Sequence, residues 1–140
     1  MKQTIDYIFV PKADINEGLT TGQVSKVAIW FTKAFIFMVP LSGVNVWELS
    51  DKKFENAGAF IDDINSKIDE MTVSEFEHKM IDFLPNERVY KVDGLQKLHI
   101  QVGFLIFGGI HIKKTGEQVQ ALNVQPKSVR AALKNFYKTS

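Results

Sequence analysis

The sequence predicts an α+β fold that combines a bent antiparallel β-sheet or barrel with helices in the middle and at the end of the chain. Residues 24–39 and 98–124 show the apolar, β-branched composition and two-residue alternation of strands. Between and after these regions, apolar side chains recur every three or four positions, which is the helical period. With 140 residues and no cysteine, we expect one domain, 1–140, that folds without disulfides.

The segment 24–39 predicts a β-hairpin that turns at Thr32 and Lys33. Val24, Val27, Ile29 and Phe31 mark its first arm, and its second arm, from Phe35 to Val39, is apolar on both faces. A strand of the second kind is typical of a position covered on both faces. The apolar run around this hairpin is interrupted by polar side chains and is too short to predict a membrane-spanning helix.

Two consecutive helices are predicted in the middle of the chain, the first at about 52–71 and the second from Thr72 to Pro85. Thr72 and Glu75 have the spacing of a capping box, which begins the second helix. Because strand patterns lie on both sides, we interpret 51–87 as a helical insertion between strands. Each helix carries one apolar stripe, formed by Phe54, Ala57, Ile61, Ile64, Ile68 and Met71 in the first and by Val73, Phe76, Met80 and Phe83 in the second.

Closely spaced strands and one helix are predicted for the rest of the chain. The segments 98–102 and 110–112 alternate in polarity, and a turn at 114–117 leads to a further strand at 119–124. Pro126 suits the first turn of a final amphipathic helix. The polar face of that helix carries the basic side chains of Lys127, Arg130, Lys134 and Lys138, and a bend or bulge is expected at Gly103, Gly108 and Gly109.

From Arg88 to Tyr137, the order of segments resembles the second half of a bacterial pleckstrin-homology-like domain. The resemblance rests on VYKVDGLQKLHIQV, FLIFGGIHIKK, the TGE turn, QVQALNV and the closing helix PKSVRAALKNFY, with KVAIWFTKAFIFMVPL as early strands. It implies a bent antiparallel barrel plugged at one open end by the C-terminal helix, and it brings no catalytic residues. The resemblance covers about 23–49 and 88–138. On the residues alone, an open sandwich with all three helices on one face of the sheet is the alternative.

Charge is distributed unevenly along the chain, although the net charge is only +1. Residues 51–87 carry a net charge of −6, whereas residues 88–140 carry +7. The near-neutral total and the acidic insertion argue against nucleic acid as a partner. The first residues include Lys2 and Asp6 before any apolar run, which predicts no secretory signal, and we therefore expect a cytoplasmic protein without an integral membrane segment.

The sequence predicts no catalytic residues, no cofactor and no metal site, and we expect a protein that is not an enzyme. The spacing of Glu75 and His78 occurs in carboxylate-bridged metal bundles, but such sites need this motif twice and it occurs here once. His99 and His111 fall on the polar phase of neighbouring strands. We expect them to lie close together on an exposed sheet face, without a third ligand for a metal.

We expect the chain to act by binding a protein partner through the outer face of the insertion. Elements added to a scaffold tend to carry the partner-specific surface, and an acidic rim around apolar anchors suits a basic partner. The spacing of the first stripe also allows a homodimer. The predicted partner-binding residues are Asp62, Asp63, Glu70 and Glu77.

The alternative function is a barrel that binds a lipid or another small ligand. Such a barrel needs an apolar pocket with space left between its side chains. The aromatic residues expected to line it are Trp30, Phe35, Phe37 and Phe104.

Overall fold

Seven strands form one antiparallel sheet in the computed structural model, which describes residues 6–16, 24–41, 57–84, 88–104, 107–117 and 119–138. The order of the strands across the sheet is β4-β3-β2-β1-β7-β6-β5, and every neighbouring pair is antiparallel. Together with the helices, this sheet confirms the predicted α+β class. The strands are β1 (Tyr7–Asn16), β2 (Val24–Thr32), β3 (Phe35–Pro40), β4 (Val89–Lys91), β5 (Leu95–Phe104), β6 (Phe107–Lys114) and β7 (Gln120–Asn123).

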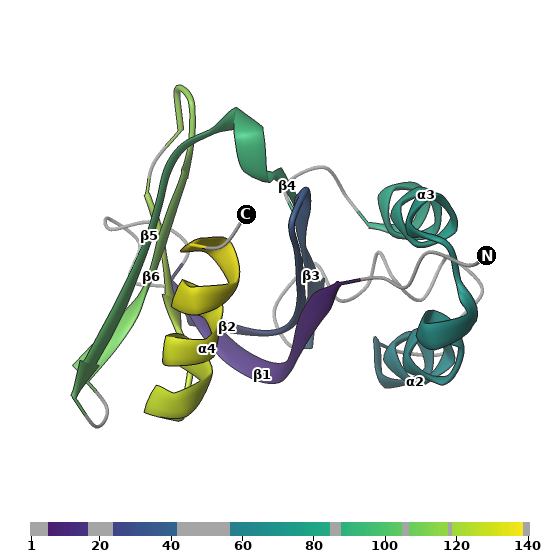
Figure 1. Ribbon diagram of the computed structural model, residues 1–140, viewed down its shortest axis with the longest axis horizontal. Helices are drawn as coiled ribbons and strands as arrows, with labels where there is room; N and C mark the ends of the chain where they lie inside the picture. The colour runs from purple at the N-terminus through teal and green to yellow at the C-terminus, as the bar shows by residue number, and fades with distance from the viewer. Residues whose placement is uncertain are drawn as a thin grey trace.

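The helices of the described residues lie on opposite faces of the sheet (Figure 1). Helix α2 (Ala57–Lys67), the short 3₁₀ helix η1 (Ile68–Glu70) and helix α3 (Val73–Phe83) follow β3 in the chain and cover its outer side. Helix α4 (Lys127–Lys138) lies inside the bend of the sheet. The expected sandwich with all helices on one face is therefore wrong, and residues 51–56 of the predicted insertion lie outside the described residues.

The sheet is bent but is not closed into a barrel, in contrast to one form of the prediction. Strands β4 and β5 are its two edges, although they follow each other in the chain. The 3₁₀ helix η3 (Val92–Gly94) carries the chain from one edge to the other, across the open side of the bend (Figure 1). Because α4 fills the concave side, the apolar residues there are buried without pairing between the edges. None of the described helices has the length and apolar composition needed to cross a bilayer.

Strand β1 joins the two parts of the sheet and has no counterpart in the prediction. Along its length it pairs with β2, and through its last residues, Asp14–Asn16, it also pairs with β7. The register of β1 shifts between Val10 and Ala13, where Pro11 stands. Proline in a strand is typical of such bulges. The bulge changes the phase of the buried residues, so that the alternation in this segment is hard to detect in the sequence.

Strands β2 and β3 contribute to two separate clusters of buried residues because alternate side chains point to opposite faces. Toward α2 and α3 lie Ala28, Trp30, Phe37 and Val39. Toward α4 lie Val27, Ile29, Phe31, Ile36 and Met38. The continuous apolar composition of β3 thus confirms the prediction of a strand covered on both faces.

The side chain of Arg130 is fully buried beneath α4, which corrects its prediction as part of an exposed basic stripe. Its Nε donates to the carbonyl oxygen of Val102 at 2.7 Å, and its Nη1 donates to that of Val124 at 2.8 Å and to Oε1 of Gln125 at 3.0 Å. Arg130 precedes the buried Leu133 by three residues and shares its helix face. Of the predicted stripe, Lys127, Lys134 and Lys138 are exposed.

At two positions of the β5–β6 hairpin, the structure explains why the residue is a glycine. Gly103 has a φ of 65° at the register shift between Gln101 and Phe104, which confirms the predicted bulge. At Gly108, a Cβ atom would lie 2.6 Å from Nε of Arg130. The buried guanidinium therefore requires a residue without a side chain at this position.

The last turn of α4 is attached to the turn between β2 and β3. The hydroxyl group of Tyr137 donates to the carbonyl oxygen of Thr32 at 2.9 Å, and burial raises the pKa of this phenol. The ammonium group of Lys33 donates to the carbonyl oxygen of Phe136 and lies 3.8 Å from the centre of its ring. These contacts hold the last turn of α4, and the hydrogen bonds of Arg130 hold the helix near its start.

We expect Arg130→Met to lower the free energy of unfolding by about 2 kcal/mol or more, because each buried acceptor left without a donor costs about 1–3 kcal/mol. Lys134→Met on the exposed side of α4 is the matched control and should change it by less than about 0.5 kcal/mol. Urea denaturation of both variants measures the difference. Equal losses would contradict the different burial of the two side chains.

Candidate functional site

The corner between α2 and α3 is formed by a capping box at Thr72, as the sequence predicts. The backbone N–H of Glu75 donates to Oγ1 of Thr72 at 3.1 Å, and the backbone N–H of Thr72 donates to Oε1 of Glu75 at 2.9 Å. Both donors would otherwise lack a partner at the start of α3. The capping box thus sets the point at which the chain changes direction.

The apolar stripes of α2 and α3 are buried against the sheet. Phe60, Ile64 and Ile68 of the first helical segment and Phe76 and Met80 of α3 have at most 1% exposure and pack on β2 and β3. The rings of Phe60 and Phe83 stack with centroids 3.8 Å apart, which joins the two helices. Nε1 of Trp30 donates to Oδ1 of Asn65 at 3.0 Å and ties β2 to α2.

This packing corrects one expectation about the insertion. The described residues of both stripes face the sheet, so they are not exposed as apolar anchors for a partner, and the homodimer stays a prediction. The structure also bears on the predicted ligand pocket. Two of the four residues expected to line it, Trp30 and Phe37, are fully buried beneath α2 and α3. Phe35 stacks on Phe37 with ring centroids 5.2 Å apart, and the side chain of Phe104 lies outside the described residues.

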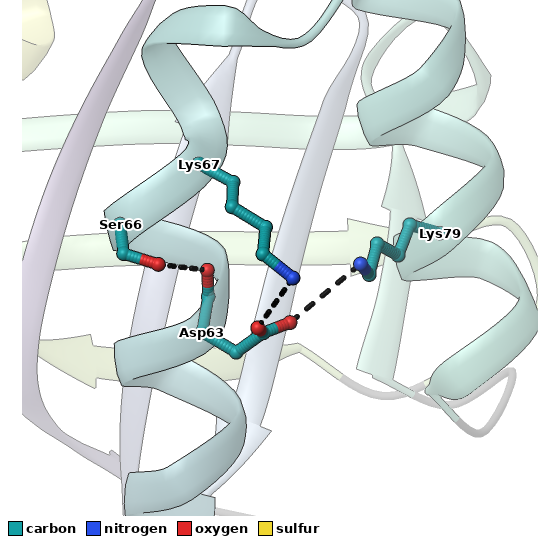
Figure 2. Close-up of polar contacts among 4 residues, drawn as sticks. All are labelled: Asp63, Ser66, Lys67 and Lys79. Carbon is teal, nitrogen blue, oxygen red and sulfur yellow. Dashed lines mark hydrogen bonds and ion pairs between the residues drawn. The ribbon is translucent and has the colours of Figure 1, made fainter.

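The four predicted partner-binding residues lie in different surroundings. Asp62 on α2 and Glu70 on η1 are exposed, and Glu77 on α3 is half-buried. Asp63 differs because its carboxylate lies between the two helices. It pairs with Lys67 of α2 at 2.8 Å and with Lys79 of α3 at 3.6 Å (Figure 2). The structure therefore gives Asp63 a role in holding the helices together.

The hydrogen bond from the Lys67 ammonium group lowers the pKa of Asp63, and the charge of Lys79 acts in the same direction. The backbone of Asp63 is engaged as well, since Oγ of Ser66 donates to its carbonyl oxygen at 2.8 Å (Figure 2). The carboxylate thus stays ionised at neutral pH and neutralises part of the basic charge of the insertion.

Ile81 on the solvent side of α3 is an exposed apolar side chain that the sequence analysis missed. Its side chain is 46% exposed, and it lines a shallow hollow of about 470 Å³ with His78, Lys79 and Asp82. The available signal was its phase, because Ile81 does not fall on the stripe that packs on the sheet. It places an apolar side chain among the charged residues of the outer face.

His99 and His111 lie directly opposite each other on β5 and β6, which confirms the predicted adjacency. Their rings are nearly parallel, with centroids 6.4 Å apart. Glu75 and His78 both have local partners, since Glu75 belongs to the capping box and Nδ1 of His78 lies 2.9 Å from the carbonyl oxygen of Ser74. Within the described ranges, no group of three or more His, Cys, Asp or Glu residues could hold a metal ion.

Comparisons with known proteins do not assign this chain to a class: no family model, no curated protein and no solved structure matches it. The arrangement of its own residues therefore carries the functional argument.

We expect Asp63→Asn to lower the free energy of unfolding by about 0.5–1 kcal/mol at neutral pH, because it removes two partly exposed ion pairs. The folded-state pKa of Asp63 is below its ordinary value of 3.8, so its contribution is complete above that pH and is lost as the pH falls through the folded-state pKa. Denaturation curves at several pH values should show the difference from wild type disappearing at acid pH.

The neighbouring Asp62→Asn is the matched control for this effect, because Asp62 is exposed. It should leave stability unchanged within about 0.5 kcal/mol at every pH. A pH-independent loss at Asp63 would show that its ion pairs do not stabilise the insertion.

Proposed function

We propose that the chain is a non-catalytic, pleckstrin-homology-like binding domain that recognises a basic surface of a protein partner. The outer face of the insertion is the proposed binding surface, and the exposure of Ile81 beside the charged side chains of Lys79 and Asp82 carries the proposal. We define this acidic face by Asp62, Asp69, Glu70, Glu77, Ile81 and Asp82. An apolar anchor with a charged rim is a common composition of protein interfaces.

The bent antiparallel sheet with a C-terminal helix in its concave side supports the pleckstrin-homology-like type. In that type, a C-terminal helix covers an open end of a bent antiparallel sheet, whereas the helical insertion at 51–87 departs from the family pattern. The cytoplasmic location belongs to the same proposal.

The charge of the insertion supports a basic partner. Residues 57–84 contain seven acidic and two basic side chains. Both basic side chains, Lys67 and Lys79, lie close to Asp63, so the remaining acidic residues dominate the outer face. Exposed negative charges on this face attract a basic partner toward the surface, and this attraction weakens when salt screens the charges.

The stability of the fold is largely independent of this surface. The two helices are held by their buried stripes and by the contact between Trp30 and Asn65. Exposed charges contribute little to folding. The acidic face is therefore free to be adapted to a partner without loss of the scaffold.

We expect the triple variant Asp62→Lys, Glu70→Lys, Glu77→Lys to fold like the wild type and to lose most of its partner capture. The measurement is affinity purification from a lysate of the source cells, with the immobilised protein as bait and quantitative mass spectrometry as readout. Capture by the wild type should fall with added salt. Ile81→Ser should also weaken capture, because it removes the apolar anchor.

The control carries Lys127→Glu, Lys134→Glu and Lys138→Glu on the exposed side of α4, which changes as many charges elsewhere. It should capture the same proteins as the wild type. If the control loses capture and the acidic-face variant keeps it, the binding surface lies on α4. If the wild type enriches no protein over an empty matrix, the proposed function is wrong.

A further inference from the structure

A polar groove of about 450 Å³ crosses the outer face of β1, β7, β6 and β5. Its residues alternate along the strands with the buried residues that face α4, so the groove lies on the side of the sheet away from that helix. It is also separate from the acidic face of the insertion (Figure 1). Its volume falls in the range of small-molecule sites, roughly 300–1,000 Å³.

The floor of the groove is hollow because side chains are excluded there. Gly109 of β6 lines the groove, and a Cβ atom there would lie 2.8 Å from the carbonyl oxygen of Leu122. On the neighbouring strand β7, Ala121 contributes only a methyl group, and the register places it opposite His111. The hollow is thus a consequence of strand packing.

The walls of the groove carry side-chain amides. Asn16 and Asn123 stand on the side of β1 and β7, and Gln101 stands on β5. An amide offers a donor and an acceptor at the same site. Oδ1 of Asn16 is buried and accepts no hydrogen bond in the structure.

The lining has one formally charged side chain, and that charge is compensated. Asp14 lines the groove, and its carboxylate lies 2.9 Å from the ammonium group of Lys26. Lys97 and Lys113 form the next pair beyond His99 and His111 along β5 and β6 and do not line the groove. The electrostatic environment therefore favours a neutral molecule over an anion or a cation.

We infer that this groove binds a neutral, hydroxyl-rich small molecule of monosaccharide size. Each hydroxyl group both donates and accepts a hydrogen bond, which matches the amides of Asn16, Gln101 and Asn123 and the carboxylate of Asp14. The glycine and alanine floor lets a flat sugar ring approach the sheet. This inference does not depend on the proposed partner binding, because the two surfaces share no residue.

The test is a titration of the 140-residue chain with D-glucose, D-galactose and N-acetyl-D-glucosamine, followed by amide chemical shifts in NMR spectra. At least one sugar should give saturable shifts at Asn16, Gln101 and Ala121. Gln101→Ala should weaken the binding about tenfold through the loss of hydrogen bonds. Ala121→Leu should abolish it by filling the floor, and the dispersion of the spectrum shows whether that variant folds.

Gln96→Ala is the matched control, since Gln96 is exposed on the same strand and does not line the groove. It should bind like the wild type. The inference is overturned if none of the three sugars gives saturable shifts, or if Gln101→Ala binds as tightly as Gln96→Ala. It is also overturned if D-glucose 6-phosphate binds more tightly than D-glucose, because the groove would then select an anion.

Discussion

The buried guanidinium of Arg130 is the interaction on which the arrangement of the fold depends. A charged group inside a protein is tolerated only when its donors are matched by well-placed acceptors. Here the acceptors are the carbonyl oxygens of Val102 and Val124 and the side chain of Gln125. They come from β5 and from the segment that enters α4. The position of α4 in the bend is therefore specified by hydrogen bonds as well as by apolar burial.

Gly108 lies close to the same guanidinium. A Cβ atom there would lie 2.6 Å from Nε of Arg130, 2.6 Å from the carbonyl oxygen of Val102 and 2.7 Å from that of Gln101, so the side chain and the backbone together leave no space for a larger residue. The next residue, Gly109, alternates with Ile110, which faces α4, and therefore lies on the outer face, where it lines the groove. Close packing of this kind leaves little freedom for substitution on either face.

The central strands separate the molecule into two cores with different consequences for function. One core lies between β2, β3 and the insertion, and the other lies between the sheet and α4. The apolar stripes of the insertion pack against the sheet, and its remaining side chains point outward, where a partner can reach them. Helices α2 and α3, which carry the acidic face, lie at the opposite end of Figure 1 from β5 and β6, which contribute to the groove, and the two surfaces share no residue.

Local features determined by the sequence alone include the capping box at Thr72 and the stripe of α3. Each depends on a short-range period or spacing, which is a property of the chain itself. The sequence placed His99 and His111 on the polar phase of neighbouring strands, and the pairing of β5 with β6 placed them opposite each other. The tertiary structure decided what covers each face. Period alone does not distinguish Arg130, which meets backbone carbonyls, from Lys134, which meets water.

The same distinction applies to β1, Asp63 and the open sheet. The bulge at Pro11 hides the alternation of β1, although β1 joins the two parts of the sheet. In the sequence, nothing distinguishes Asp63 from the other acidic residues of the insertion. Its ion pair with Lys79 depends on the packing of α3 beside α2. Apart from β1, the sequence by itself determined the main elements and their apolar faces, because these follow from neighbouring residues. Only the tertiary structure decided the strand order, the opposite placement of the helices and the pairing of charges, because these join residues that are distant in the chain.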